Sequence, residues 1–460
     1  MVRERFFLEG ATLVDGSRTD ILVRDGLLTV GDDAMTGARD ATRIDAAGLL
    51  ALPGLVDLHT HLRQPGYEQS ETVLTGTRAA AAGGYTTVFA MANTLPVADT
   101  AGIVEQELSL GLAAGYATVQ PIGAVTVGLA GERLADLEGM AQSAAKVRVF
   151  SDDGLCVFDP LLMRRALEQV KAFGGVIAQH AQEPRLTVGA QLNDGALAEQ
   201  LGLAGWPAVA EESIIARDVL LAEHTESRLH VCHLSTAGSV EVVRWAKARG
   251  IDVTAEVTPH HLLLTEELAA TGDPRYKVNP PLRRVEDVQA LREALADRTI
   301  DIVATDHAPH PVATKTGDWS AAANGMVGLE SALSVVHRAV VENGMLGWED
   351  VARVMSHTPA RIGRVDRGTA LATGSRADLL LYDPTAVDAF TTDRLAGKGV
   401  NSPYLGRELP GRVLWTIHEG TAVLRDGALI EPAEAAQASA HDRADGRTRH
   451  ARTQEDDTRG

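Results

Sequence analysis

The 460-residue chain has little cysteine and no long apolar run. Cys156 and Cys232 are its two cysteines, and neither belongs to a CxxC pair, which argues against a disulfide framework or a structural zinc knuckle. No stretch reaches the roughly 18 consecutive apolar residues of a membrane-spanning helix. The first residues, MVRERFFLEG, lack the apolar core of a signal peptide. We therefore expect a cytoplasmic protein that does not enter a membrane.

Basic residues are scarce as well. The chain has 43 lysines and arginines against 62 aspartates and glutamates, so its formal charge is −19. The field of such a protein repels polyanions, which argues against nucleic acid and anionic membranes as partners. A small anionic substrate stays possible, because a local cationic site can override the mean field. The hydrophobic content of 45% is normal for a globular protein with a sizeable core.

The two ends of the chain have the same character. Both contain short apolar runs around glycine turns, such as LEGATLVDG near the start and HEGTAVLRDG near the end, and this pattern is typical of antiparallel strands. We expect one small β-sandwich made of residues 1–51 and 365–430. Residues 431–460 contain no Val, Ile, Leu, Met or aromatic side chain. They cannot bury enough apolar surface to offset their ordering entropy, so we expect a disordered tail.

Residues 52–364 alternate between β-like and helix-like stretches. The β-like runs are LPGLVDLH, GYTTVFAMAN, YATVQPIGAVT, KVRVFSDD, GGVIAQHA, RLHVCHLS, IDVTAEVT and IDIVATDH. Most are almost continuously apolar, as expected for parallel strands that are covered on both faces. Eight such units predict an α/β fold of the (β/α)8 TIM-type barrel class. A doubly wound open sheet is the alternative, but no GxGxxG motif follows the first run.

Chemically active side chains stand at the ends of these runs, where a barrel gathers its active site. They are His59, His61, Asp152, Asp153, His180, His233, Asp306 and His310. The first two histidines share one strand face, because side chains alternate with period two, and they can hold one divalent ion. Each residue also has an ordinary interpretation: a solvated strand end, a core histidine, a turn aspartate or a helix N-cap. Their coincidence predicts a metal centre of four imidazoles and a bridging carboxylate.

Five motifs add a family resemblance. GLVDLHTHLRQPG, AMANT, FSDDG, KVNPPLR and ATDHAPH, in this order, resemble the amidohydrolase superfamily and, within it, the long-chain dihydroorotases of bacterial pyrimidine synthesis. The likeness covers the chain up to residue 430. It implies two divalent metal ions, expected to be Zn²⁺, with ligands that match His59, His61, Asp153, His180, His233 and Asp306.

The resemblance also assigns these ligands to the two ions. His59, His61 and Asp306 match the ligands of one ion, His180 and His233 match those of the other, and Asp153 matches the bridge. Many relatives bridge with a carboxylated lysine at the end of the fourth strand, where this chain has none. Lys146 lies at the opposite end of that run. The choice of Asp153 over Asp152 rests on the resemblance, which also implies that Asp306 is the general acid/base.

Substrate contacts follow from the same resemblance. Arg63, Asn93 and His310 match groups that hold the carboxylate of the orotate ring, and Asn279 matches a residue near the ring. His61 and Gly325 complete this set. Residues 310–328 correspond to a mobile substrate loop, in which many relatives have an aromatic residue where this chain has Asn324. Because of that change, the resemblance does not tell which contact this loop makes with the substrate.

The implied reaction is the reversible cyclisation of N-carbamoyl-L-aspartate to L-dihydroorotate, in which the two ions activate water. One alternative is another cyclic amidohydrolase, such as an allantoinase or a dihydropyrimidinase (hydantoinase). Their substrates lack a ring carboxylate and have no use for the arginine clamp. A second alternative is a non-catalytic dihydroorotase-like partner of aspartate transcarbamoylase, but here every ligand position is filled. We expect a homodimer, and a complex with the transcarbamoylase is compatible with activity.

Overall fold

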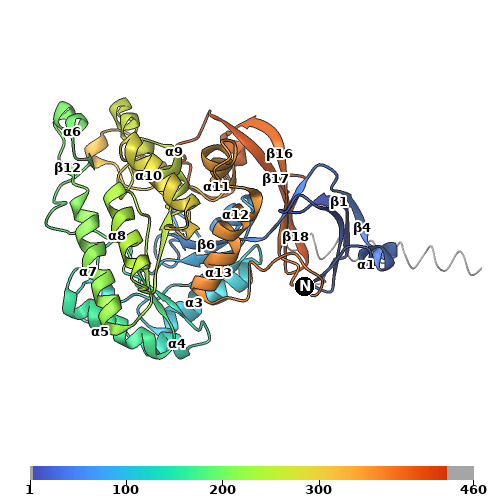
Figure 1. Ribbon diagram of the computed structural model, residues 1–460, viewed down its shortest axis with the longest axis horizontal. Coiled ribbons are helices and arrows are strands. Elements are labelled where there is room, and N and C mark those ends of the chain that lie inside the picture. The colour runs from blue at the N-terminus through green and yellow to red at the C-terminus, as the bar shows by residue number, and fades with distance from the viewer. Residues whose placement is uncertain (1–3, 432–460) are drawn as a thin grey trace, which may run out of the picture.

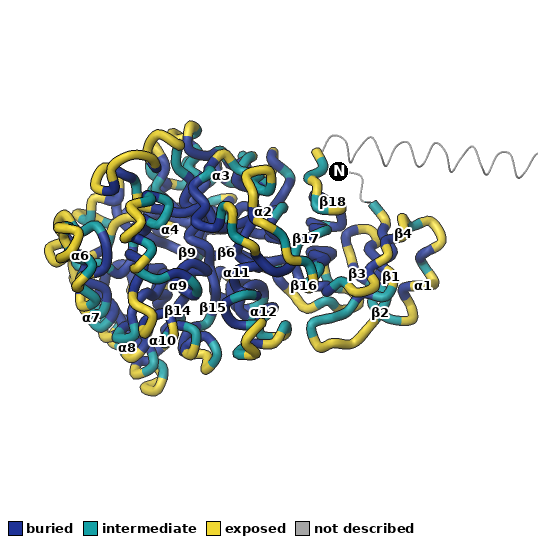
Figure 2. Tube along the Cα trace, turned by 90° about the horizontal axis from the view of Figure 1, so that it is seen from above, coloured by how far each residue is buried: buried dark blue, intermediate teal, exposed yellow. Residues whose placement is uncertain are grey.

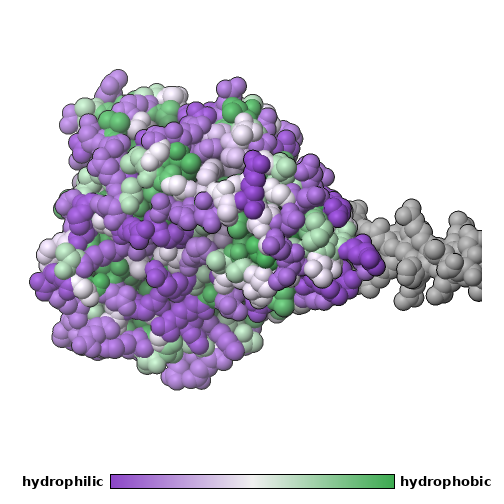
Figure 3. Space-filling view, turned by 45° about the vertical axis from the view of Figure 1, so that its right-hand side comes forward, coloured by the Kyte–Doolittle hydropathy of each residue, from purple (hydrophilic) through white to green (hydrophobic). Residues whose placement is uncertain are grey.

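The computed structural model describes residues 4–431, and these residues divide between an α/β body and an antiparallel sheet (Figure 1). The expected tail, residues 431–460, lies outside the described residues except for Glu431. Within the described range, no helix combines the length and apolar character needed to cross a membrane. The face drawn in Figure 3 is mostly hydrophilic, with hydrophobic residues in small scattered groups.

Eight short parallel strands occupy the centre of the α/β body. They are β6 (Leu55–Thr60), β7 (Tyr85–Ala90), β8 (Thr118–Pro121), β9 (Val149–Phe150), β10 (Val176–Gln179), β13 (Leu229–Val231), β14 (Val253–Val257) and β15 (Ile302–Val303). The first three pair in one sheet and the other five in a second sheet. Parallel bridges Gly123–Phe150 and Thr60–His307 connect these sheets at both edges. Each of the eight predicted runs coincides with one of these strands, although β6 extends one residue beyond its run, to Thr60.

Helices follow the strands in the chain and lie outside them, as Figure 1 shows. They are α2 (Val73–Ala82), α3 (Ala101–Ala114), α4 (Leu137–Gln142), α5 (Pro160–Ala172), α7 (Val209–Thr225), α8 (Ala237–Ala248), α9 (Pro259–Leu263), α10 (Val285–Ala296), α11 (Ala332–Val336), α12 (Trp348–Ala352) and α13 (Thr358–Gly363). A smaller insertion after β10 holds β11 (Leu192–Asn193), α6 (Ala196–Leu201) and β12 (Gly205–Trp206).

Helix α5 illustrates why these segments are helical. Asp159 caps the first turn by accepting a hydrogen bond from Leu162 N at 2.8 Å, and Pro160 occupies the first helical position. Buried residues then recur at helical spacing on one face, namely Leu162, Met163, Ala166, Leu167 and Val170. The resulting apolar stripe packs this helix onto the strands.

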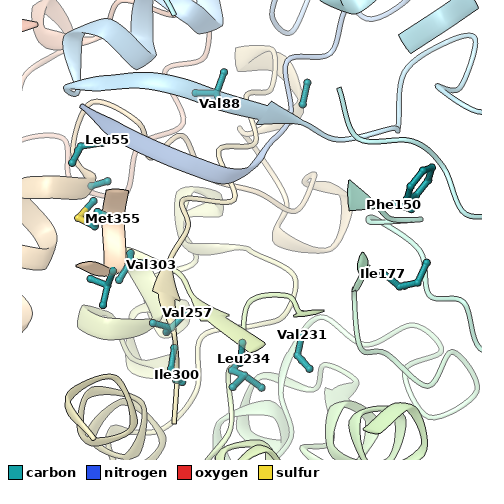
Figure 4. Packing of buried hydrophobic residues seen from close by; sticks show 14 of the residues in the cluster. Leu55, Val88, Phe150, Ile177, Val231, Leu234, Val257, Ile300, Val303 and Met355 are labelled. Atoms are coloured by element: carbon teal, nitrogen blue, oxygen red, sulfur yellow. The ribbon is translucent and has the colours of Figure 1, made fainter. Parts of the chain in front are cut away.

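Two of the hydrophobic clusters in the core alternate along the parallel strands. Leu55, Val88 and Ile177 belong to a cluster that also contains helix residues such as Met163 and Val219. The adjacent Val56, Phe89 and Ala178 belong to a second cluster, made largely of strand residues. Figure 4 shows the first set spread around the strands. Because neighbouring side chains point to opposite faces, the strands are buried on both sides, and Figure 2 shows this buried interior.

Strands from both ends of the chain form one further sheet. They are β1 (Phe6–Thr12), β2 (Arg18–Arg24), β3 (Leu27–Val30), β4 (Thr42–Asp45), β5 (Leu50–Pro53), β16 (Leu379–Ala389), β17 (Glu408–His418), β18 (Thr421–Arg425) and β19 (Ala428–Leu429), with the short helix α1 (Asp33–Thr36) beside them. Strand β5 connects the two ends, because it pairs with both β1 and β16. The hydrogen bonding thus gives one continuous sheet, and the two-layered sandwich stays a prediction.

Candidate metal centre

The six predicted metal ligands come together where the parallel strands end. They are His59, His61, Asp153, His180, His233 and Asp306, and none is more than 5% exposed. Buried polar groups need partners, and six such groups without apolar shielding between them are costly to bury. The positions of their ring nitrogens and carboxylate oxygens therefore indicate what the site binds.

The first group consists of His59, His61, Asp153 and Asp306. His61 Nε2 lies 3.0 Å from Asp306 Oδ1 and 3.3 Å from Asp153 Oδ2. His59 Nε2 lies 3.3 Å from Asp153 Oδ2, yet it makes no hydrogen bond within the described residues. Two ring nitrogens and two carboxylates thus face a common point, as ligands of one divalent cation do.

The second group consists of Asp153, His180 and His233. His180 Nδ1 and His233 Nε2 are 2.9 Å apart, and Asp153 Oδ1 lies 3.3 Å and 3.2 Å from them. Lone pairs on three such atoms repel one another unless a proton or a cation lies between them. These residues therefore fit a second divalent cation, with Asp153 shared between both groups through its two oxygens.

The neighbouring carboxylate, Asp152, is used differently. Its Oδ1 accepts hydrogen bonds from Val125 N at 2.8 Å and Thr126 N at 3.0 Å, and its Oδ2 accepts one from the Thr126 hydroxyl. Asp152 thereby fixes the backbone that follows β8. The geometry leaves Asp153 as the bridging candidate, an assignment that periodicity alone could not make.

The backbone at this end of the strands is strained. Arg63, His233 and Asp306 have φ values of 63°, 30° and 49°, in the left-handed region that non-glycine residues rarely occupy. Asp57 holds part of this geometry in place, because it accepts hydrogen bonds from Thr305 N at 3.0 Å and Thr305 Oγ1 at 2.5 Å. Burial raises the pKa of Asp57 to about 6, although the Thr305 hydrogen bonds oppose the shift.

Glu256 is a functional residue that the sequence reasoning missed. Its Oε1 lies 2.6 Å from His59 Nδ1 and accepts a hydrogen bond from His233 N at 3.2 Å. Its Oε2 lies 3.0 Å from His230 Nε2. Burial raises the pKa of Glu256, but His59 and His230 together hold it below its ordinary value. A charged residue in the apolar run IDVTAEVT was the available signal.

Glu256→Gln is expected to weaken metal binding about 10–100-fold, the usual effect of removing a carboxylate that orients a metal-binding histidine. Glutamine keeps the shape of the side chain but loses the charge that holds His59 in the correct tautomer. The measurement is a competition titration against a chromophoric chelator. Glu241→Gln, on the exposed face of α8, serves as the control. Equal metal affinity in both variants would contradict this role.

The predicted substrate residues line one cavity beside the metal ligands. This cavity of about 290 Å³ lies near the lower limit of small-molecule sites. All six predicted residues contribute to its wall: His61, Arg63, Asn93, Asn279, His310 and Gly325. Arg63 Nε and Asn279 Oδ1 are buried without a hydrogen-bond partner among the described residues. Such atoms are available to a ligand.

Asn93 and His310 already have protein partners. Asn93 Oδ1 lies 3.0 Å from His61 Nδ1, so Asn93 orients a metal-binding candidate as well as facing the cavity. His310 Nε2 donates to the carbonyl of Asn324 at 2.7 Å. Burial and the charge of Arg63 lower the pKa of His310 to about 3, so its imidazole is neutral at neutral pH.

Asn401 is a second residue that the sequence reasoning missed. Its Nδ2 donates to the carbonyls of Ala308 and Gly325 at 2.9 Å and 3.1 Å, and its Oδ1 accepts from His310 N at 3.2 Å. Gly325 has φ 133°, and a Cβ there would lie 2.7 Å from the Ala308 Cβ. Only glycine therefore fits, and no motif in the sequence pointed to Asn401.

His261, Cys232 and Lys146 are not among the six predicted ligands, and they do not line the cavity beside them. His261 contacts Thr258 Oγ1 and the carbonyl of Pro280, which is a structural role. Cys232 is buried in the same core cluster as Val56, and its Sγ lies within 4.8 Å of ligand atoms of His59 and Glu256. Lys146 lines a different cavity, together with Arg148 and Arg364.

Comparison with known proteins connects this geometry to a family. A family model described as dihydro-orotase-like matches residues 48–239. The dihydroorotase of Leifsonia xyli subsp. xyli is 73% identical over 94% of this chain and 98% of its own length. The dihydroorotase of Streptomyces coelicolor is 62% identical over 92% of this chain and 99% of its own length.

A solved structure supports the same superfamily. The L-hydantoinase (dihydropyrimidinase) from Arthrobacter aurescens has a TM-score of 0.82 and 26% identity, covering 93% of this chain and 98% of that chain. The sequence identity between this hydantoinase and the chain is far below that of the two dihydroorotases, so the hydantoinase alternative is not favoured. The chain belongs to the dihydroorotase family, a group of metal-dependent cyclic amide hydrolases within the amidohydrolase superfamily.

Proposed function

We propose that this protein catalyses the reversible cyclisation of N-carbamoyl-L-aspartate to L-dihydroorotate in pyrimidine biosynthesis. The observation that carries the proposal is Arg63, whose buried, unpartnered Nε faces a cavity that Asp153 and Asp306 also line. A half-buried guanidinium that forms no ion pair with a carboxylate of residues 4–431 fits an anionic ligand, and its planar fork suits a carboxylate. Substrates of allantoinases and dihydropyrimidinases do not carry that ring carboxylate.

The metal content that fits the site is two divalent ions, for which we propose zinc. His59, His61 and Asp306 would hold one ion, His180 and His233 the other, and Asp153 would bridge them. Neutral imidazoles and carboxylates are ligands that zinc accepts readily. When bound, such ions polarise a carbonyl group and make water acidic enough to attack it near neutral pH.

The side chains of the chain perform the remaining tasks. Arg63 and Asn93 would donate to the ring carboxylate, and His310 would do so by turning its Nε2–H from the carbonyl of Asn324 to the substrate. Asn279 and Gly325 would contact the ring, and His61 would serve both the metal and the substrate. Asp306 accepts a proton from the attacking water and passes it to the leaving ring nitrogen, as a general base and then a general acid. Cyclisation uses the same proton transfers in reverse.

The architecture that we propose for this reaction is a (β/α)8 barrel of residues 52–364. The closed order of the eight strands, with bridges at both sheet edges, supports it. Residues 1–51 and 365–430 would form the accessory sandwich. In a barrel the carboxyl ends of all strands meet at one face, which accounts for a site assembled from residues 59 to 306.

The deciding experiment compares four substrates with purified, zinc-loaded protein: dihydroorotate, dihydrouracil, hydantoin and allantoin. We expect turnover of dihydroorotate alone. Turnover of a substrate without the carboxylate would contradict the role of Arg63 and favour a hydantoinase-like enzyme. No turnover of any of the four, with metal bound, would favour a non-catalytic role beside aspartate transcarbamoylase.

Arg63→Lys is expected to raise KM for dihydroorotate at least about tenfold, because lysine keeps the charge but loses the bidentate fork. The expected change in kcat is smaller, since the group binds the carboxylate in ground and transition states alike. Steady-state kinetics in the hydrolytic direction measure both constants. Arg185→Lys, on an exposed residue that pairs with Glu183, is the matched control. An unchanged KM would remove Arg63 from the substrate site.

We also propose a cytoplasmic homodimer that can associate with aspartate transcarbamoylase. The two thiols, Cys156 and Cys232, are free, which suits a reducing compartment. Light scattering of the purified protein, alone and with the transcarbamoylase, tests both assemblies.

A further inference from the structure

Two buried lysines lie behind the wall that Asn324 and Gly325 give to the cavity. Lys277 and Lys315 are only 4% and 5% exposed. Within residues 4–431, neither forms an ion pair with a carboxylate. A buried ammonium without a carboxylate is unusual, because desolvation disfavours its charge. Each buried amine therefore depends on hydrogen bonds to uncharged groups around it.

Both lysines bond to backbone carbonyls of the loop at the cavity. Lys277 Nζ donates to the carbonyls of Trp319 at 2.8 Å, Ser320 at 3.3 Å and Ala322 at 2.8 Å. Lys315 Nζ donates to the carbonyls of Lys277 and Ala323, each at 3.0 Å. The number of bonds matches the donors, because an ammonium has three N–H groups and a neutral amine has two.

The surroundings lower the pKa of both amines. Burial lowers the pKa of Lys277, and Asp318 opposes the shift. Burial and the neighbouring Lys277 lower the pKa of Lys315 to about 7, while Asp273 opposes the shift. A neutral Lys315 still has two N–H groups for its two carbonyls, so these hydrogen bonds persist on both sides of that pH.

One of the carbonyls that accept these hydrogen bonds also accepts one from a predicted substrate residue. The carbonyl of Lys277 accepts a hydrogen bond from Gly325 N at 3.0 Å as well as from Lys315 Nζ. The adjacent carbonyl of Asn324 accepts from His310 Nε2 at 2.7 Å. Lys277 also lies two residues before Asn279. Movement of either amine would thus move the part of the cavity wall that faces the substrate.

Most of the loop is exposed, and Trp319 anchors it in a small hydrophobic cluster with Leu192, Ala198 and Ala269. Of residues 311–323, only Lys315, Trp319 and Ala322 are buried, and Val312 is 58% exposed. Trp319 anchors one point by donating Nε1–H to the carbonyl of Gln191 at 3.2 Å. A segment with so few apolar contacts would otherwise have low local stability. The two amines add hydrogen bonds to backbone carbonyls of the loop, beyond the apolar contacts that Trp319 makes at one point.

We propose that Lys277 and Lys315 are positioning residues that fix residues 311–325 in the conformation that receives the substrate. Neither touches the reacting atoms. They act through Asn324, Gly325 and His310, and so they set how well the cavity is formed before the substrate binds. The identity of the substrate in this inference rests on the proposed function.

The kinetic test compares Lys277→Met and Lys315→Met with the parent protein. Methionine keeps the length of the apolar stem and removes the N–H donors. We expect KM for dihydroorotate to rise at least about tenfold, because a loop that must be ordered on binding lowers affinity. We expect kcat to stay within about threefold and the metal content to stay unchanged. Lys146→Met, at an exposed lysine of a different cavity, should behave as the parent protein.

A folded variant with the parent KM overturns the inference, and so does a loss confined to kcat. Thermal unfolding identifies variants that fail because the whole protein is unstable. The second measurement needs no variant: amide hydrogen exchange of the parent protein at Ala323 and Gly325, which donate to Thr314 and Lys277 carbonyls. Protection of both amides supports the inference, and exchange at the rate of an unstructured peptide overturns it. Absence of dihydroorotate turnover would affect only the proposed function, since exchange does not depend on it.

Discussion

Asp306→Asn is expected to lower kcat for dihydroorotate by about 10²–10⁴-fold, the usual contribution of a general acid/base. Asparagine keeps an oxygen that can face His61, now 3.0 Å from Asp306 Oδ1. It cannot accept a proton from water or deliver one to the ring nitrogen. Single-turnover measurements at saturating substrate isolate this step from binding.

The control for this experiment is the metal content, since Asp306 is also a candidate ligand. Asp136→Asn, at the N-cap of α4, checks the effect of the same chemical change at a distance. If the Asp306 variant retains both metal and turnover, another group must transfer the proton. If it loses metal in proportion to activity, Asp306 acts chiefly as a ligand.

Asp153→Ala is expected to abolish activity and to lower the bound metal to less than one ion per chain. Asp153 lies within 3.3 Å of all four imidazoles, with Oδ2 toward His59 and His61 and Oδ1 toward His180 and His233. In the proposed site its charge would offset that of two cations, and its removal would expose each cation to the repulsion of the other. Atomic absorption after gel filtration gives the stoichiometry.

Asp152 offers a matched comparison one residue away. Asp152→Asn should retain both ions and instead reduce the free energy of unfolding by about 1–3 kcal/mol, because it weakens buried hydrogen bonds to Val125 and Thr126. Chemical denaturation measures that loss. Metal loss from the Asp152 variant, with retention in the Asp153 variant, would reverse the assignment of the bridge.

Much of the fold could be predicted because strand periodicity is local. Runs such as GGVIAQHA and IDIVATDH contain β10 and β15, and the ends of these runs bring His180 and Asp306 to the site. The sheet formed by both chain ends was harder to predict, because the alternation of apolar and polar residues predicts strands but not which strands pair. Strand β5 joins the strands of both chain ends because it pairs with β1, which is near it in the sequence, and with β16, which follows hundreds of residues later.

The supporting residues of the site could not be found in this way. Glu256 faces His59 across 197 positions, and Asn401 reaches His310 across 91. Lys277 stands in the quoted motif KVNPPLR, yet nothing in that motif shows that its amine is buried under loop carbonyls. Such residues act through hydrogen bonds set by tertiary packing, which leaves no periodic pattern in the sequence.

The hydrogen bonds between Asp57 and Thr305 have a consequence for how the protein is made. They span 248 positions, and they fix the turn that brings Asp306 beside His61. During synthesis, His59 and His61 emerge from the ribosome long before Asp306. Two imidazoles without further ligands hold a metal only weakly. Contacts this distant in sequence form late and slowly. We therefore expect the group of His59, His61, Asp153 and Asp306 to be complete only after residue 306 has been made, and a ribosome-bound chain that ends earlier to hold a metal there only weakly.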